Sequence, residues 1–339
     1  MRRVRRSARL TATAVVALAC TVAGCSSTKS GGDDGGSGSG SGGKVVVGLV
    51  TKTNSNPYFV KLRESAKAQA DKRGAKLIAL AGKFDGDNQG QVDAINNLVA
   101  QKVTGILITP SSSKGVLGAI AAARSKGVLV IALDTATEPA DAVDATFATD
   151  NEDAGVKQGA YVKAALGQAD PKVVLLDGTP GSTVDDLRHN GFLEGFGIAE
   201  KSPAVKGTAV TNGDQSKAQT AMENLLQREP GVNAVYTINE PAAAGAAQAV
   251  GTRKGVVVGS IDGSCTGVRN VAAGKFAATV MQFPQKMAAM GVDAVADYAK
   301  DDTKKPEGFV DTGSELITDK QVGSVASKDT AWGLKNCWG

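Results

Sequence analysis

The alternation of short aliphatic runs with helical stretches constrains the fold of this chain more than any other feature. From Lys44 onward, each apolar run is followed by a stretch with apolar residues at helical spacing, as in VDAINNLVAQKV (92–103). The expected strands are 45–50, 76–81, 105–109, 128–133 and 145–149, and then 173–177, 207–210, 234–238, 256–262 and 276–283. Strands that are apolar along their whole length are typical of parallel sheets covered by helices on both faces. Two such series predict an α/β protein with two similar doubly wound lobes.

Polar side chains gather at the ends of these expected strands. In an open α/β sheet, ligands bind beyond the carboxyl ends of the strands. The candidates at or near such ends are Asn56, Asp134, Arg188, Asn239, Asp262 and Gln282. Their amides, carboxylates and guanidinium group offer both donors and acceptors, which a neutral polyhydroxy ligand needs because each hydroxyl both donates and accepts.

The segment TKTNSNPYF (51–59) links the first expected strand to a helix. Asn56 offers amide donors and acceptors, and Pro57 favours the start of a helix. Tyr58 and Phe59 have two interpretations, which the sequence leaves open. They either present an apolar face to a sugar ring or only pack the helix onto the sheet.

Six motifs carry a resemblance to the type I periplasmic binding proteins for sugars, the ribose-binding group and its relatives. NPYF, LDT, LRHNGF, INEPAAAGA, SIDG and VMQFP occur in the order that this family has, and the resemblance covers nearly all of residues 44–339. The stretches TKTNSNPYFVKL, DATFATDN, TAMENLLQ and YTINEPAAAGA are most similar to the fructose-binding branch. The resemblance implies two lobes joined by a three-segment hinge, with crossings near 145–149, 282–284 and 310–314.

The same resemblance implies a set of sugar contacts. They fall on Asn56, Tyr58, Phe59, Asp134, Arg188, Asn239, Asp262 and Gln282, with Lys52 as a further contact. Three positions depart from the ribose binders. Lys52 replaces a small hydroxyl residue, Thr135 replaces a second arginine, and Gly213 replaces an aromatic residue. These departures argue against ribose itself and favour fructose, another ketose, or a different hexose or pentose.

The function implied is capture of a monosaccharide for an ABC-type sugar importer. The sugar would bridge both lobes and favour the closed form, which would dock on the permease subunits as a monomer. No cofactor, metal or enzymatic activity is expected. We expect that alanine at Asp134 or Arg188 abolishes binding without unfolding the protein.

Three other functions compete with import. A sensor that presents sugar to a membrane receptor or kinase would have the same lobes, so this alternative stays open. A sugar-responsive repressor would need a helix-turn-helix headpiece before the first strand. A glycosidase would need one carboxylic acid with a raised pKa among residues such as Asp134 and Asp262.

Residues 1–24 are typical of a lipoprotein signal peptide. MRRVRRSAR carries five arginines, and the apolar region after it ends in VAGC, which resembles a bacterial lipobox with Cys25 as the lipidated residue. Cys20 competes for that role, and an ordinary secretory signal is the alternative. Residues 25–43 are then a lipid-anchored Gly/Ser linker. The predicted location is extracytoplasmic, with the lipid on Cys25 holding the chain at the outer face of the cell membrane.

Charge agrees with this division. The chain has 38 basic and 34 acidic residues, and without the five arginines of the leader 33 bases face 34 acids, a net charge of −1. The basic excess therefore belongs to the leader, and no nucleic-acid partner is expected.

No apolar stretch after residue 43 has the ~20 residues of a spanning helix.

The predicted lobes are discontinuous in sequence. The N-terminal lobe comprises 44–147 and 283–311, and the C-terminal lobe comprises 148–282 and 312–339. Export favours a Cys265–Cys337 disulfide near the C-terminus, with two free buried thiols as the alternative.

Three further signals have simple interpretations. His189, the only histidine, is expected to be a solvated surface residue rather than a ligand contact. DGDNQG (85–90) starts like a calcium loop but lacks its glutamate, so Asn88 is expected to cap a helix. Trp332 and Trp338 are expected to pack the C-terminal tail.

Overall fold

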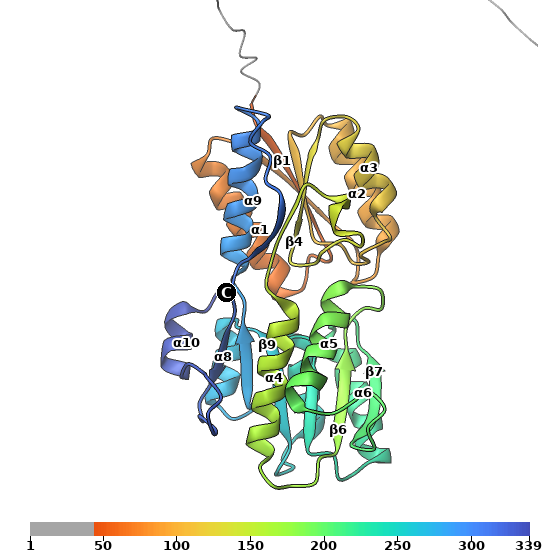
Figure 1. Cartoon of the computed structure of the whole chain (residues 1–339), viewed down its shortest axis with the longest axis vertical. Coiled ribbons are helices and arrows are strands. Elements are labelled where there is room, and N and C mark those ends of the chain that lie inside the picture. Colours follow the sequence, from red (N-terminus) through yellow and green to blue (C-terminus); the bar gives the residue numbers. More distant parts are fainter. Residues whose placement is uncertain (1–43) are drawn as a thin grey trace, which may run out of the picture. The chain divides into compact units, whose positions relative to one another are not determined.

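The structure, a computed structural model, describes residues 44–339 and contains two sheets of six strands each (Figure 1). The predicted signal peptide, the linker and Cys25 lie outside the described residues. None of the helices in 44–339 is both long and apolar enough to cross a bilayer.

The first sheet, with the helices that cover it, forms the first lobe. Its strand order is β11-β5-β4-β3-β1-β2, and every neighbouring pair is parallel. The strands are β1 (Val46–Thr51), β2 (Lys76–Ala81), β3 (Gly105–Ile108), β4 (Leu129–Leu133), β5 (Ala145–Ala148) and β11 (Gly308–Asp311). The helices are α1 (Pro57–Lys72), α2 (Asn88–Ala100), α3 (Leu117–Arg124), the short 3-10 helix η1 (Ala140–Ala142) and α9 (Pro284–Tyr298). One hydrophobic core joins the sheet to α1 and α9, and another joins it to α2 and α3.

The second sheet forms the second lobe and repeats this order as β12-β10-β9-β8-β6-β7. Its neighbours are parallel except β12, which runs antiparallel to β10. The strands are β6 (Val173–Asp177), β7 (Val205–Val210), β8 (Ala234–Thr237), β9 (Val257–Asp262), β10 (Ala278–Met281) and β12 (Glu315–Thr318). The helices are α4 (Asn151–Leu166), α5 (Thr183–Phe196), α6 (Gln215–Arg228), α7 (Glu240–Val250), α8 (Cys265–Ala272) and α10 (Thr330–Asn336).

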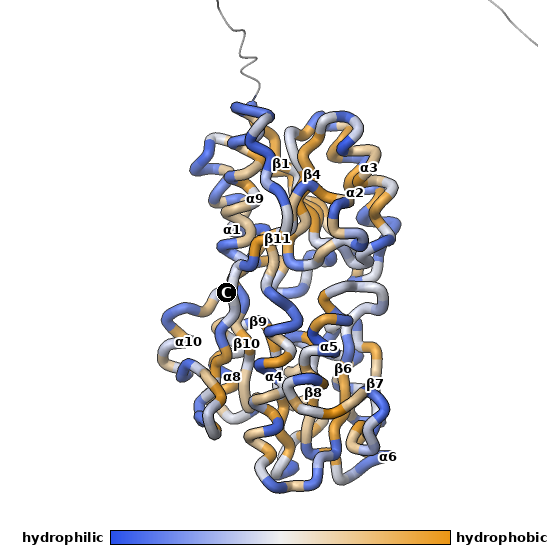
Figure 2. The backbone as a smooth tube through the Cα atoms, in the orientation of Figure 1, coloured by the Kyte–Doolittle hydropathy of each residue, from blue (hydrophilic) through white to orange (hydrophobic). Residues whose placement is uncertain are grey.

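The chain passes between the lobes three times. It leaves the first lobe after β5, returns between β10 and α9, and crosses again between β11 and β12. Both the fold class and the three-segment connection predicted from the sequence are therefore confirmed. The last strand is shorter than the predicted range 276–283, because β10 ends at Met281 and Phe283 is the N-cap of the helix that begins at Pro284. Figure 2 shows hydrophobic segments along the strands of both lobes.

Helices α4 and α5 pack backbone against backbone, and this close approach positions Arg188. A Cβ on Gly155 of α4 would lie 2.4 Å from the carbonyl oxygen of Arg188, and one on Gly191 of α5 would lie 2.2 Å from that of Glu152. Glycine at these positions lets the helices approach more closely than any side chain would permit. The packing thus fixes the part of α5 that carries Arg188.

Candidate functional site

All nine residues that the sequence predicts as sugar contacts line one cavity between the lobes. The cavity measures about 40 Å³, and its walls come from both lobes. Lys52, Asn56, Tyr58, Phe59 and Asp134 come from the first lobe, and Arg188, Asn239, Asp262 and Gln282 come from the second. They converge because each follows or ends a parallel strand, or starts the next helix, at the edge of its sheet that faces the other lobe.

Arg188 is the central cation of the site and is 3% exposed. Its Nε donates to Asn151 Oδ1 (2.8 Å) and its Nη1 donates to the Ile238 carbonyl (2.9 Å). Nη2 is buried without a hydrogen-bond partner and lies 4.0 Å from Asp134 Oδ1. Two anchored nitrogens thus orient a third that remains free to donate to a ligand.

Asp134 faces Arg188 from the end of β4. Its backbone has φ +63°, a conformation that costs a non-glycine residue free energy and is often found at binding sites. The hydroxyl of Thr135 donates to its Oδ2 (3.0 Å), so Thr135, which does not line the cavity, holds the carboxylate in place.

Asp262 and Gln282 form the acceptor side of the second lobe. Gln282 Nε2 donates to Asp262 Oδ1 (3.1 Å), and the Glu240 N–H donates to Asp262 Oδ2 (3.1 Å). Gln282 Oε1 is buried without a partner. Burial raises the pKa of Asp262, and the negative charge of Glu240 raises it further. Burial also raises the pKa of Glu240, against the hydrogen bonds that Ser264, Thr279 and Gly263 donate to it.

The aromatic residues Tyr58 and Phe59 pack the helix onto the sheet, which was one of their two interpretations, and contact with a sugar ring stays a prediction. Tyr58 and Phe59 are buried in the core of the first lobe and also line the cavity. Their rings meet edge to face with centroids 5.5 Å apart, and Tyr58 meets Trp338 in the same way at 5.6 Å. Burial raises the pKa of Tyr58 well above its usual value, so its hydroxyl stays protonated.

Asn56 and Asn239 cap the helices that follow them. Asn56 Oδ1 accepts from the Tyr58 N–H (2.9 Å), and Asn239 Oδ1 accepts from the Ala242 N–H (2.9 Å). The Asn239 side-chain nitrogen also donates to the Gly213 carbonyl (3.2 Å), so both polar atoms of this side chain have partners within the second lobe.

Four polar side chains of the cavity were not predicted from the sequence, namely those of Asp85, Thr179, Ser182 and Asp185. They follow β2 and β6, so the strand-end rule could have found them, although no motif distinguishes them. Asp185 Oδ1 accepts from the Gly178 N–H (2.6 Å), yet burial raises the pKa of Asp185 to about 6.

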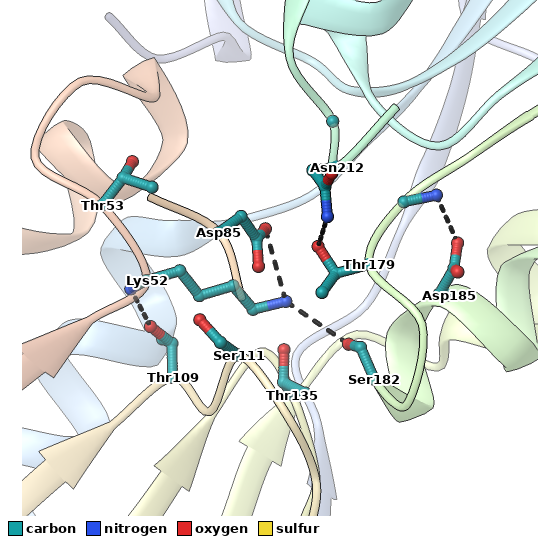
Figure 3. Close-up of polar contacts among 12 residues, drawn as sticks. Lys52, Thr53, Asp85, Thr109, Ser111, Thr135, Thr179, Ser182, Asp185 and Asn212 are labelled. Atoms are coloured by element: carbon teal, nitrogen blue, oxygen red, sulfur yellow. Dashed lines mark hydrogen bonds and ion pairs between the residues drawn. The ribbon is translucent and has the colours of Figure 1, made fainter. Parts of the chain in front are cut away.

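The lobes also touch each other directly around the cavity. Lys52 Nζ donates to Ser182 Oγ (3.4 Å) across the gap (Figure 3), and the Thr183 N–H donates to Ser113 Oγ (2.9 Å). These contacts, together with the small volume, identify a closed arrangement of the lobes.

His189 is not the solvated residue that the sequence predicted. Its side chain is 15% exposed and lies between Asp177 Oδ1 (2.8 Å) and Glu200 Oε2 (2.5 Å), and it does not line the cavity. The hydrogen bond to Asp177 raises the pKa of His189 to about 9, with a further contribution from Glu200.

This environment predicts a pH-dependent stability. Between its ordinary pKa of 6.5 and about 9, His189 holds a proton in the folded state that the unfolded chain releases, so the free energy of unfolding falls as pH rises. In urea unfolding between pH 7.5 and 9, wild type is expected to lose stability, and His189→Gln is expected to show a flatter profile. Equal slopes in both proteins would contradict the ion pairs of His189.

Two other sequence predictions concern residues outside the cavity. Asp87, not Asn88, caps α2, because its carboxylate accepts from the Gly90 N–H (3.0 Å) and Asn88 is already the first helical residue. Cys265 and Cys337 form a disulfide. Among residues 44–339, no group of three His, Cys, Asp or Glu side chains is arranged to hold a metal ion.

Comparison with known proteins relates this chain to periplasmic binding proteins. Residues 47–304 match a family described as periplasmic binding protein domain. The ribose import binding protein of Bacillus subtilis (strain 168) is 31% identical over 278 residues, which cover 82% of this chain and 88% of that protein. The D-allose-binding periplasmic protein of Escherichia coli (strain K12) is 31% identical over 262 residues, covering 74% and 84%. A carbohydrate transporter solute binding protein from Agrobacterium radiobacter, solved with D-arabinose, superposes with TM-score 0.73 at 26% identity, covering 81% and 94%.

Proposed function

Since this chain belongs to the periplasmic binding protein family, we propose that it captures a monosaccharide between its two lobes and delivers it to an ABC-type sugar importer. The observation that carries the proposal is the cavity itself. Nine strand-end residues from both lobes converge there, and Arg188 Nη2 and Gln282 Oε1 are buried in its wall without partners. A free donor and a free acceptor in the wall of one cavity suit hydroxyl groups, which can satisfy both. The relatives named for ribose and allose binding support a ligand of the size of a monosaccharide.

The sugar enters when the lobes are apart. The cavity of about 40 Å³ is far smaller than the ~300–1,000 Å³ of a small-molecule site, and side chains bridge the lobes around it. Rotation about the three crossing segments would open the cleft, and contacts from both lobes would then favour closure over the sugar. Fructose or another ketose is the first candidate, ahead of other hexoses and pentoses, because the segments around Asn56 and Asn239 are most similar to the fructose-binding branch.

The chain works outside the cytoplasm as a binding protein rather than an enzyme, and as a monomer. We include in the proposal that Cys25 carries the lipid anchor and that residues 25–43 tether the binding unit to the membrane. Residues 44–147 with 283–311, and 148–282 with 312–339, are the two bodies that move.

Uptake of labelled sugar tests delivery to an importer. Deleting the gene should abolish uptake of the sugar that the purified protein binds, and the wild-type gene should restore it whereas Arg188→Ala should not. Binding that persists in vitro while uptake is unchanged by the deletion would reject the importer role and favour a sensor that presents sugar to a membrane receptor or kinase.

A further inference from the structure

Asp85 is a carboxylate in the cavity wall that no family motif marks. It lies in the loop between β2 and α2, and it is one of the residues that the structure, not the sequence, brings to the site. Its Oδ1 is buried and accepts no hydrogen bond. Its Oδ2 lies 4.0 Å from Lys52 Nζ, too far for a hydrogen bond but close enough for charge attraction (Figure 3).

Lys52 supplies a donor beside this free acceptor. Its side chain is 6% exposed, and its ammonium group lies between Asp85 and Ser182 (Figure 3). An ammonium group has three donors, and the structure assigns one of them to Ser182 Oγ (3.4 Å). The lysine and the aspartate together present what one hydroxyl needs, a donor and an acceptor side by side.

Asp85 also lines a second and larger cavity beside the first. The second cavity measures about 700 Å³ and shares Asn56, Asp85, Gly213 and Asp262 with the first. Gly213 lines both cavities at φ +61°, and the Asn239 amide packs directly against it, because a Cβ at this position would lie 2.4 Å from Asn239 Nδ2. A ligand that is held by Arg188 and Asp134 and reaches Asp85 therefore meets the border of this larger space.

We propose that Lys52 and Asp85 bind the hydroxyl on the additional carbon by which a hexose exceeds a pentose, so that this protein selects six-carbon sugars. The inference rests on the proposed function and names the substrate class within it. A pentose would leave the Asp85 carboxylate and the Lys52 ammonium without that partner, and unpaired buried polar groups are a strong basis for rejecting a ligand.

Calorimetric titration with matched sugars tests the selection. Fructose and xylulose, allose and ribose, galactose and L-arabinose, and glucose and xylose differ within each pair by one hydroxymethyl group. For the pair that contains the best ligand, wild type should bind the hexose roughly 10- to 100-fold more tightly, the range of a hydrogen bond to a charged group. Asp85→Ala and Asp85→Asn should remove most of that preference by weakening hexose binding, with the pentose affinity unchanged within about threefold. Asp93→Asn, which alters an exposed acid on α2, should behave as wild type.

Three results would overturn the inference. Equal affinity of wild type for the hexose and the pentose would show that the protein does not select six-carbon sugars. An equal loss of both affinities in Asp85→Ala would show that Asp85 only supports the loop. Absence of binding to any monosaccharide would reject the proposed function together with the inference, whereas the first two results leave the proposed function intact.

Discussion

Arg188→Ala is expected to abolish sugar binding, with a loss of affinity of roughly 100-fold or more, because a charged donor is removed from a buried site. In wild type, Nε and Nη1 are held by Asn151 and the Ile238 carbonyl, so Nη2 is oriented in advance toward the cavity. Without the guanidinium group, Asp134 also loses its nearby positive charge. The measurement is calorimetric titration with the sugar that wild type binds.

Three further variants separate binding from folding. Arg188→Lys keeps the charge but lacks the planar fork, so it should recover only part of the affinity. Asp134→Asn keeps the shape of its side chain and should also bind weakly. Arg228→Ala, at an exposed arginine on α6, is the matched control and should bind as wild type. Normal binding by Arg188→Ala, with native circular dichroism, would show that the sugar binds elsewhere.

Loss of the Cys265–Cys337 disulfide is expected to have the largest effect on stability. The bridge joins the start of α8 to the residue after α10 and closes a loop with a sequence separation of 72. A loop of this length predicts a loss of about 4 kcal/mol in the free energy of unfolding. Urea unfolding of the Cys265→Ala/Cys337→Ala variant should show this decrease, and wild type under reducing conditions should match the variant. A change below about 0.5 kcal/mol would contradict the bridge as a stabilising element.

The same variant should also bind sugar more weakly. The bridge holds the C-terminal tail, where the Trp338 Nε1 donates to the carbonyls of Asp262 (3.2 Å) and Gln282 (3.1 Å). Trp338 also packs against Tyr58 across the lobes. The tail therefore supports three of the residues that line the cavity.

Periodicity predicted the two α/β lobes, and strand-end chemistry predicted six of the residues that line the cavity, whereas Lys52 and the three-segment hinge came from the family resemblance. Continuous apolar strands such as 128–133 have only one stable environment, a sheet covered on both faces, so their carboxyl ends had to form the binding edge. Asp134 and Asp262 were found because each directly ends such a strand. The edge strands β11 (GFVD) and β12 (ELIT) were not predicted, because they are short and mixed in polarity and are recognised only from their partners β5 and β10.

Other parts depend on contacts that no local pattern encodes. Asp85 was considered only as part of a calcium-like loop, and its position beside Lys52 becomes visible only when the loop after β2 is placed against β1. Nothing in the sequence around the glycines of α4 and α5 explains why glycine occurs inside a helix. The explanation is the backbone of the facing helix, which leaves no room for a side chain. His189 has carboxylate partners 12 and 11 residues away in sequence, so its ion pairs could not be predicted from its neighbours.

Thermal unfolding of the purified protein with a panel of sugars tests the central claim most directly. The panel consists of fructose, ribose, glucose, galactose, xylose, arabinose and inositol. A ligand that binds only the folded state adds about 2.7 kcal/mol at a hundredfold excess over its dissociation constant, which raises the unfolding temperature. We expect a clear shift with at least one sugar in wild type and none with that sugar in Arg188→Ala. If no sugar on the panel shifts wild type, or if the same shift persists in Arg188→Ala, monosaccharide capture between the two lobes is contradicted.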